Sequence, residues 1–101
     1  MARGADLSAC WEQGRRLYTP HLDLAWRPSP AGLPRSAIVV PRFQYTAVAR
    51  NQLRRRLKEI VRRQLASLPA VDLVVRAKRA AYAVSFATLR AELTEGVTRV
   101  T

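Results

Sequence analysis

Apolar side chains recur at helical spacing between residues 47 and 68, the stretch with the clearest period in the chain. Six of them fall on one face of a helix: Leu53, Leu57, Ile60, Val61, Leu65 and Leu68. The opposite side is polar and mostly cationic, and seven cations accompany one anion between Arg50 and Arg63. The pattern predicts an amphipathic helix over residues 47–68, capped by Thr46 and stopped by Pro69.

Three shorter stretches are typical of β-strands. Leu22, Leu24 and Trp26 alternate with polar or small residues, which is the pattern of a half-buried strand. Residues 27–34 contain three prolines and a glycine, so they are predicted to form a loop. Residues 36–40 are predicted as a second strand. Its apolar positions are continuous, so we expect this strand at the centre of the sheet, covered on both faces. Residues 72–77 form the third predicted strand.

Two further helices are predicted near the ends of the chain. The first begins at Asp6 or Ser8 and ends near Gly14, and the last is capped by Ser85 and ends at Gly96. The order of elements is then α-β-β-α-β-α. We therefore expect an α+β fold: a single-layer mixed sheet of three to four strands packed against a long central basic helix, with short N- and C-terminal helices. The length suits a single domain over residues 1–101.

The charge of the chain narrows its possible partners. The net charge is +11, and 49% of the residues are apolar, enough to exclude global disorder. Such a charge indicates a polyanionic partner, nucleic acid before an anionic membrane. No apolar run approaches the roughly 18 residues of a membrane span, and the first residues lack the apolar segment of a secretory signal. Cys10 is the single cysteine, so we expect no internal disulfide and a cytoplasmic location.

The chain offers few groups for catalysis by the protein itself. A two-metal nuclease needs converging carboxylates, yet only Glu92 and Glu95 of the seven carboxylates lie close in sequence. His21 is the sole histidine and has no obvious partner in the sequence. Cys10 is expected to pack as a small apolar residue rather than act as a nucleophile. We therefore expect no catalytic and no metal-binding residue.

The cationic side of the central helix favours RNA binding over a merely solvated face. A solvated helix usually interleaves Glu with Lys or Arg at i,i+4, whereas Glu59 stands almost alone among seven cations. Arginine predominates, and its planar guanidinium suits phosphates and exposed bases. Five aromatic residues are candidates for stacking on single-stranded bases, with core packing as the alternative: Trp11, Tyr18, Trp26, Phe43 and Tyr45.

Specific motifs resemble one protein family. Residues 47–51 read AVARN and are followed by Arg54-Arg55 and Lys58-Glu59, which resembles the signature of the protein subunit of bacterial ribonuclease P. Four further stretches resemble motifs of that family in the same order: GRR at 14–16, RSAIVV at 35–40, DLVV at 72–75 and SFATL at 85–89. The main departures are Gln52 in place of an arginine and Tyr45-Thr46 in place of Gly-Asn.

The resemblance implies a protein that helps a catalytic RNA to remove the 5′ leader from precursor tRNA. The RNA would perform the hydrolysis, with magnesium held mainly by the RNA subunit. The residues expected to bind the ribozyme are Arg50, Asn51, Arg54, Arg55, Lys58 and Arg62. The residues expected to bind the leader are Trp11, Arg15, Arg16, Trp26, Arg42 and Phe43. The expected partners are thus the RNA subunit and the precursor tRNA leader, with no membrane and no protein partner.

Two other functions fit parts of the sequence. A general or ribosome-associated RNA-binding module could use the same basic helix without any role in cleavage. An autonomous nuclease is disfavoured because the carboxylates do not converge. Reconstitution with ribozyme RNA and precursor tRNA separates the three functions.

Overall fold

The computed structural model describes residues 4–100 and contains three α-helices, four β-strands and two 3₁₀ segments. Their bounds, in chain order, are α1 Gly4–Gln13, β1 Arg15–Tyr18, β2 Leu22–Pro28, β3 Arg35–Val39, α2 Ala47–Gln64, η1 Leu65–Ser67, β4 Val71–Ala77, η2 Arg79–Ala83 and α3 Phe86–Val100. The α+β class and the order of the predicted elements are confirmed. No helix within this described part of the chain is long and apolar enough to cross a membrane.

The four strands form one mixed sheet in the order β1-β2-β4-β3. β1, β2 and β4 pair antiparallel, whereas β3 pairs parallel to β4. The fourth strand, β1, was allowed for but not located by the sequence pattern. The central position expected for residues 36–40 was wrong, because β3 is an edge strand and its five residues are only partly buried. The fully buried apolar run belongs instead to β4, which has a strand on each side.

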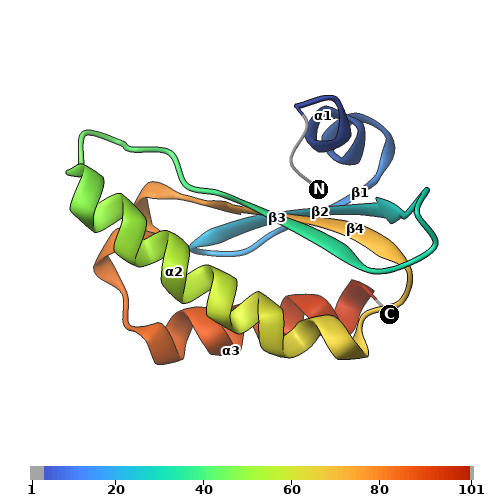
Figure 1. Ribbon diagram of the computed structural model, residues 1–101. Helices are drawn as coiled ribbons and strands as arrows, with labels where there is room; N and C mark the ends of the chain where they lie inside the picture. Colours follow the sequence, from blue (N-terminus) through green and yellow to red (C-terminus); the bar gives the residue numbers. More distant parts are fainter. Residues whose placement is uncertain (1–3, 101) are drawn as a thin grey trace.

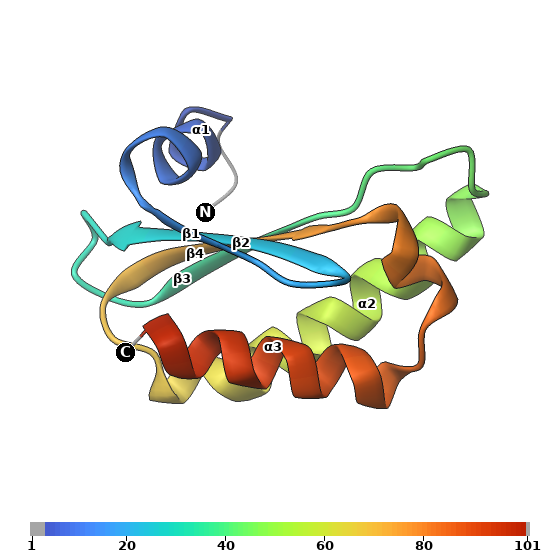
Figure 2. The same cartoon turned by 180° about the vertical axis from the view of Figure 1, so that it is seen from behind.

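The helices lie on both faces of this sheet (Figures 1 and 2). α2 and α3 run side by side under one face, and α1 lies on the other. We call these the α2/α3 face and the α1 face. The main core fills the α2/α3 face with buried residues from the sheet and both helices: Leu22, Leu24, Leu73, Val75, Leu57, Ile60, Leu89 and Leu93. A smaller cluster on the α1 face joins Cys10 to Ala25 and Val74.

The ends of α2 follow local rules. Thr46 caps the helix as predicted, and its Oγ1 accepts a hydrogen bond from the backbone N–H of Ala49 at 3.1 Å. At the other end the α-helix stops at Gln64, earlier than expected, and tightens into η1 before Pro69. Leu53, Leu57, Ile60 and Val61 are buried, so the predicted apolar face does pack on the core.

Two glycines have different roles from each other. Gly14 ends α1 as predicted, where a Cβ would lie 2.2 Å from the carbonyl oxygen of Trp26. Gly96 was expected to end the last helix, but α3 continues to Val100. Gly96 is instead buried inside the helix, where a Cβ would lie 2.4 Å from Leu24 Cδ1. The absent side chain allows α3 to approach the sheet closely, so this glycine serves packing rather than termination.

Candidate nucleic-acid interface

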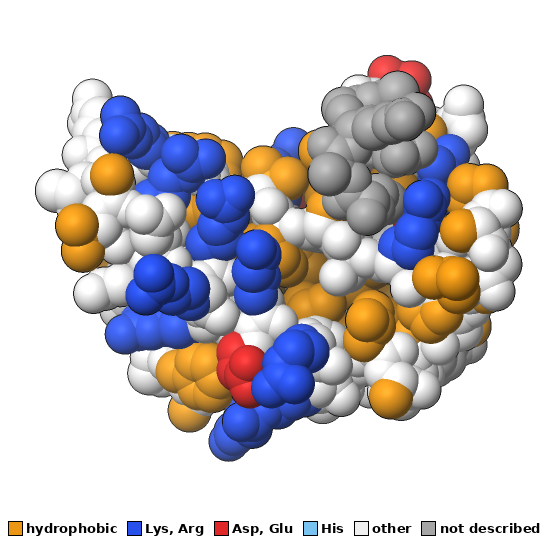
Figure 3. Space-filling model, in the orientation of Figure 1, with side chains coloured by type: hydrophobic (Ala, Val, Ile, Leu, Met, Phe, Trp, Pro, Cys, Tyr) orange, Lys and Arg blue, Asp and Glu red, His pale blue; other side chains and the backbone are white. Residues whose placement is uncertain are grey.

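The cations of α2 point away from its buried face, as the helical period requires. Asn51, Arg55 and Lys58 are exposed, and Arg54 is half-buried along one flank of the helix. Blue basic side chains accordingly gather over α2 and the loop before it in the space-filling view (Figure 3). Arg50 differs from the others because its Nε donates a hydrogen bond to the carbonyl oxygen of Val40 at 2.8 Å. Arg50 thus ties the start of α2 to the end of β3, in addition to its charge.

Arg62 is the one predicted RNA contact on α2 that forms an ion pair with another described residue. Its Nη2 lies 2.9 Å from Glu59 Oε1, and Arg63 Nε reaches the same oxygen at 3.0 Å. Hydrogen bonds from Arg62 and Arg63 lower the pKa of Glu59, and the bond to Glu59 raises the pKa of Arg62. Glu59 therefore neutralises part of the positive charge in the C-terminal half of α2. The uncompensated charge lies toward the start of α2.

A groove of about 540 Å³ runs between α2 and β3. Its lining combines apolar side chains with three cations, and comprises Leu7, Ser36, Ala37, Ile38, Arg54, Lys58, Val61, Arg62 and Leu65. Because β3 is an edge strand, this groove lies beside an unpaired strand edge. The sequence pattern did not reveal it, since the strand order decides which strand α2 flanks.

Trp11 and Arg76 form a second feature on the α1 face. The guanidinium of Arg76 lies 4.3 Å from the centre of a Trp11 ring, a cation–π contact. Arg76 also bonds Asp23 through Nη2 at 3.0 Å, and Lys78 Nζ lies 3.3 Å from the same carboxylate. Trp11 was predicted from sequence but Arg76 was missed. The available signal was its position in β4, where it interrupts the apolar run on the side opposite Val75.

Trp26 lies on the other face of the sheet from Trp11. It is half-buried against the main core, and it lines an open hollow of about 700 Å³ at the β1 edge. The hollow is lined by Gly14, Arg15, Arg16, Tyr18, Trp26 and Arg99. The structure thus brings Arg15, Arg16 and Trp26 together but separates all three from Trp11. Tyr18, 58% exposed, was one of the five aromatic candidates for stacking, whereas Arg99 was not among the predicted site residues.

Arg42 and Phe43 lie at a third place, in the loop between β3 and α2. Arg42 is exposed and Phe43 is half-buried. Phe43 and Gln44 have positive φ angles of 49° and 70°, which non-glycine residues adopt at a cost. The turn is closed by a 2.8 Å hydrogen bond from the Tyr45 N–H to the Arg42 carbonyl oxygen. The six predicted leader contacts therefore occupy three separate sites rather than one.

His21 has a partner that the sequence did not indicate. Its Nδ1 lies 2.6 Å from Glu92 Oε2, and its backbone N–H donates to Glu92 Oε1 at 2.8 Å. Thr19 also hydrogen-bonds Glu92. Burial raises the pKa of Glu92, but the hydrogen bonds from Thr19 and His21 outweigh it and lower that pKa. The cluster fastens the β1–β2 turn to α3, which is a structural role.

These features define a small basic α+β protein whose central helix presents an exposed cationic face. The family model described as Ribonuclease P matches residues 1–101. A ribonuclease P protein component from Acidothermus cellulolyticus is 38% identical over 104 residues, covering 100% of this chain and 87% of the relative. One from Aliivibrio salmonicida is 37% identical over 81 residues, covering 79% of this chain and 69% of the relative.

Solved structures of ribonuclease P proteins have the same fold. The RNase P protein from Thermotoga maritima, in complex with 1-(4-fluorophenyl)-2-thiourea, has a TM-score of 0.89 and 26% identity, covering 100% of this chain and 99% of that one. The protein from Staphylococcus aureus, 20% identical, shares the fold with a TM-score of 0.87 over 99% of this chain and 92% of that one. The chain belongs to the ribonuclease P protein family, the RNA-binding protein subunits of the endoribonuclease that matures the 5′ end of tRNA. The family implies an RNA subunit as partner.

Proposed function

We propose that the basic face of α2 binds the RNA subunit of ribonuclease P, while the α1 face of the sheet receives the 5′ leader of precursor tRNA. The observation that carries this proposal is the division of α2 into two sides. Leu53, Leu57 and Ile60 fix one side in the core, so the backbone positions that carry the cations opposite them are fixed before RNA arrives. A pre-positioned array of cations loses little conformational entropy on binding phosphates. A cytoplasmic location is part of the same proposal.

The leader site rests on Trp11 and Arg76. α1 lies on only part of its face of the sheet, and the surface is hollowed between α1 and the loop leading into α2 (Figure 3). A single-stranded leader that crosses the α1 face would meet the Trp11 ring for stacking and the nearby Arg76 guanidinium for phosphate. Trp26 lies on the opposite face of the sheet, so any contact that it makes with RNA would be in the hollow at the β1 edge.

Magnesium is assigned to the RNA subunit in this proposal. No three His, Cys, Asp or Glu side chains gather as a metal site within the described part of the chain. The three most buried carboxylates are already engaged: Asp72 and Asp23 with cations and Glu92 with His21. The proposal therefore attributes no catalytic step to residues of the protein.

The test is reconstitution of the protein with the RNA subunit and precursor tRNA at low magnesium concentration. We expect stimulated 5′ cleavage, and a variant with Arg54, Arg55 and Lys58 all changed to Ala should bind the RNA subunit far more weakly. These three side chains form no hydrogen bond or ion pair with other described residues, so the variant should fold normally.

The matched control changes Arg56, Arg63 and Arg90 to Ala and removes the same charge from exposed positions that are not among the six predicted ribozyme contacts. It should retain most of the affinity. Equal losses in the two variants would refute the assignment of the α2 face. Binding without stimulated cleavage would favour a general RNA-binding module, and cleavage by the protein alone would favour a nuclease.

A further inference from the structure

Two tyrosines from distant parts of the chain stack beside the start of α2. The ring centres of Tyr45 and Tyr82 lie 4.0 Å apart, and the ring planes differ by 2°. Tyr45 belongs to the loop before α2, and Tyr82 to η2, which follows β4. The two rings differ in burial: Tyr45 is 38% exposed, whereas Tyr82 is half-buried and packs against the main core. The pair therefore joins a ring that is anchored on the core to a ring that reaches the surface.

The pair is held rigidly from both sides. The Tyr82 hydroxyl donates a hydrogen bond to the Pro41 carbonyl oxygen at 2.7 Å. Tyr45 is fixed by its backbone N–H bond to Arg42, within the turn where Phe43 and Gln44 adopt positive φ angles. Backbone strain of this kind persists only where the surroundings enforce it. The stack therefore has a defined orientation in the free protein.

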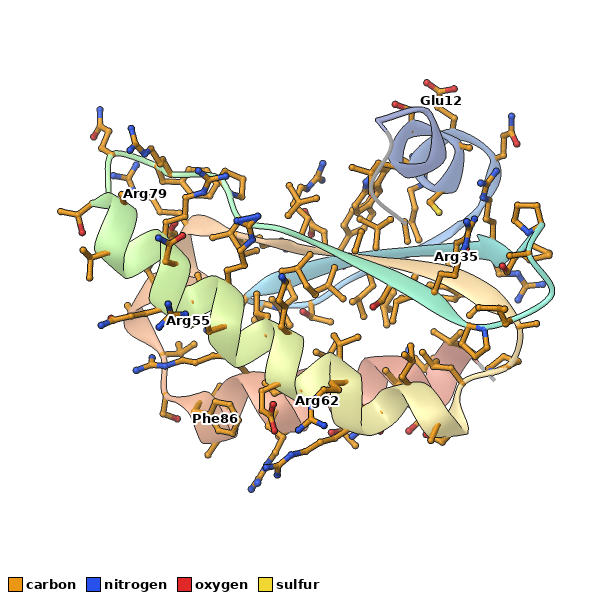
Figure 4. All side chains as sticks on the ribbon, in the orientation of Figure 1. Glu12, Arg35, Arg55, Arg62, Arg79 and Phe86 are labelled. Carbon is orange, nitrogen blue, oxygen red and sulfur yellow. The ribbon has the colours of Figure 1, made fainter. Side chains whose placement is uncertain are left out.

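Cations surround the stack. Arg42 and Arg79 are exposed, and Arg50 is half-buried at the first turn of α2. Arg50 and Arg42 both lie close enough to Tyr82 to counteract, through their charges, the rise of its pKa that burial causes. Figure 4 shows Arg79 beside the loop that leads into α2, at the same end of the molecule. A flat aromatic ring beside several cations matches a nucleotide, whose base stacks and whose phosphate carries negative charge.

We propose that Tyr45, backed by Tyr82, is a stacking platform for an unpaired base of the RNA subunit. The site continues the basic face of α2, so this inference rests on the function proposed above. It differs from that function in kind, because the platform recognises a base and the α2 cations recognise phosphates. The precursor tRNA leader is a less suitable occupant, since the site proposed for it lies nearer α1.

The test measures the affinity of the full chain for the RNA subunit. Tyr45→Leu keeps an apolar side chain but removes the ring, and it should weaken binding about tenfold, within the range expected for one base stack. Tyr45→Phe keeps the ring and should bind within twofold of the natural protein. The control is Tyr18→Leu, an exposed tyrosine of β1, which should not change the affinity.

The salt dependence gives a second readout. A stacking contact releases no counterions, so Tyr45→Leu should lower affinity equally at all salt concentrations. The Arg54, Arg55 and Lys58 triple variant should instead reduce the slope against salt. Photocrosslinking of the unmodified complex should join the Tyr45 peptide to an unpaired nucleotide, a result that does not depend on the stability of any variant.

Unchanged affinity of Tyr45→Leu, or an equal loss in Tyr45→Phe, would overturn the platform. If the α2 triple variant still loses binding in that case, the α2 interface stands and only the stacking site is wrong. If neither variant loses binding, the RNA interface lies elsewhere.

Discussion

Asp72 is the most deeply buried charge among the described residues, with no exposed side-chain surface. Arg35 Nε donates to its Oδ1 at 2.7 Å, and Arg27 Nε donates to its Oδ2 at 3.2 Å. These three residues lie in register across β2, β4 and β3. Asp72 therefore joins three strands of the sheet at one level. Its hydrogen bonds with Arg35 lower its pKa, despite the opposing effect of burial.

This residue should make stability depend on acid pH. A carboxylate whose pKa is depressed in the folded state stabilises the protein fully above its unfolded-state pKa, and this stabilisation is lost as the pH falls from about 5 through the folded pKa. Asp72→Asn leaves two partly buried arginines without their anion and should cost about 3 kcal/mol at pH 7. Urea unfolding at pH 7 and pH 4 measures both effects.

The variant should also show a weaker loss of stability between these pH values than the natural protein. Glu59→Gln is the control, because that carboxylate and its arginine partners are exposed, and exposed ion pairs contribute little. An equal effect of the two substitutions would contradict the role assigned to Asp72.

Substitutions of the two tryptophans should affect different properties, leader affinity for Trp11 and stability for Trp26. Trp11→Leu removes the ring beside Arg76 and should reduce the gain in substrate affinity that a 5′ leader provides by about 1 kcal/mol or more. Trp26→Leu should mainly lower the free energy of unfolding, because Trp26 packs on the core. The measurement compares binding of precursor tRNA with and without its leader to the reconstituted enzyme. Equal losses of leader affinity would argue against the α1-face site.

At the scale of elements, α1 depends on the close approach at Gly14. A Cβ there would meet two backbone carbonyl oxygens, those of Trp26 and Cys10, at 2.2 and 2.6 Å. Backbone atoms cannot move aside easily, so Gly14→Ala should cost about 1–3 kcal/mol. It should also loosen the packing of α1 on the sheet.

Cys10 reports that loosening directly. Its side chain is fully buried between α1 and the sheet, so its thiol should react slowly with an aromatic disulfide reagent. Gly14→Ala should accelerate this reaction. Gly32→Ala is the matched control: Gly32 has a φ of 72° but open space around its Cβ position, so the substitution should cost about 1 kcal/mol without changing the thiol rate. Equal acceleration would show global rather than local opening.

The elements that the sequence predicted well are those with a strong local signal. Thr46 and the apolar spacing of α2 placed the central helix, although Pro69 predicted an end later than Gln64, and Gly14 placed the end of α1. β1 and the edge position of β3 depend on pairing between distant segments, which local patterns do not encode. The end predicted for the last helix at Gly96 was wrong, because a glycine can either end a helix or permit close packing within one.

The candidate site shows the same division. The basic residues of α2 followed from periodicity and from the family resemblance. Arg76, the groove beside β3 and the Tyr45–Tyr82 stack were missed, because each joins residues 37 or more positions apart or depends on strand order. Trp11 and Trp26 lie on opposite faces of the sheet because α1 packs on the face away from the Trp26 side chain. The sequence does not indicate on which face α1 packs.

At the scale of the whole molecule, the net charge of +11 is carried by a body of 36 × 26 × 20 Å. Basic residues lie on α2, at the β1 edge and around the loop before α2. If about six phosphates are contacted, affinity for the RNA subunit should fall by about three decades between 50 and 200 mM salt. Titrations at several salt concentrations measure the slope. A slope near zero would contradict an electrostatic interface.

The position of β4 has a consequence for how the chain folds. β4 pairs with both β2 and β3, yet it is the last strand to leave the ribosome. Before then only the β1–β2 hairpin can form, and β3 has no partner. Closing the long connections to β4 costs chain entropy before the strand pairs form and stabilise the sheet. Assembly of the sheet therefore waits for residues 71–77, and a nascent chain that ends earlier displays its basic segment without a finished scaffold.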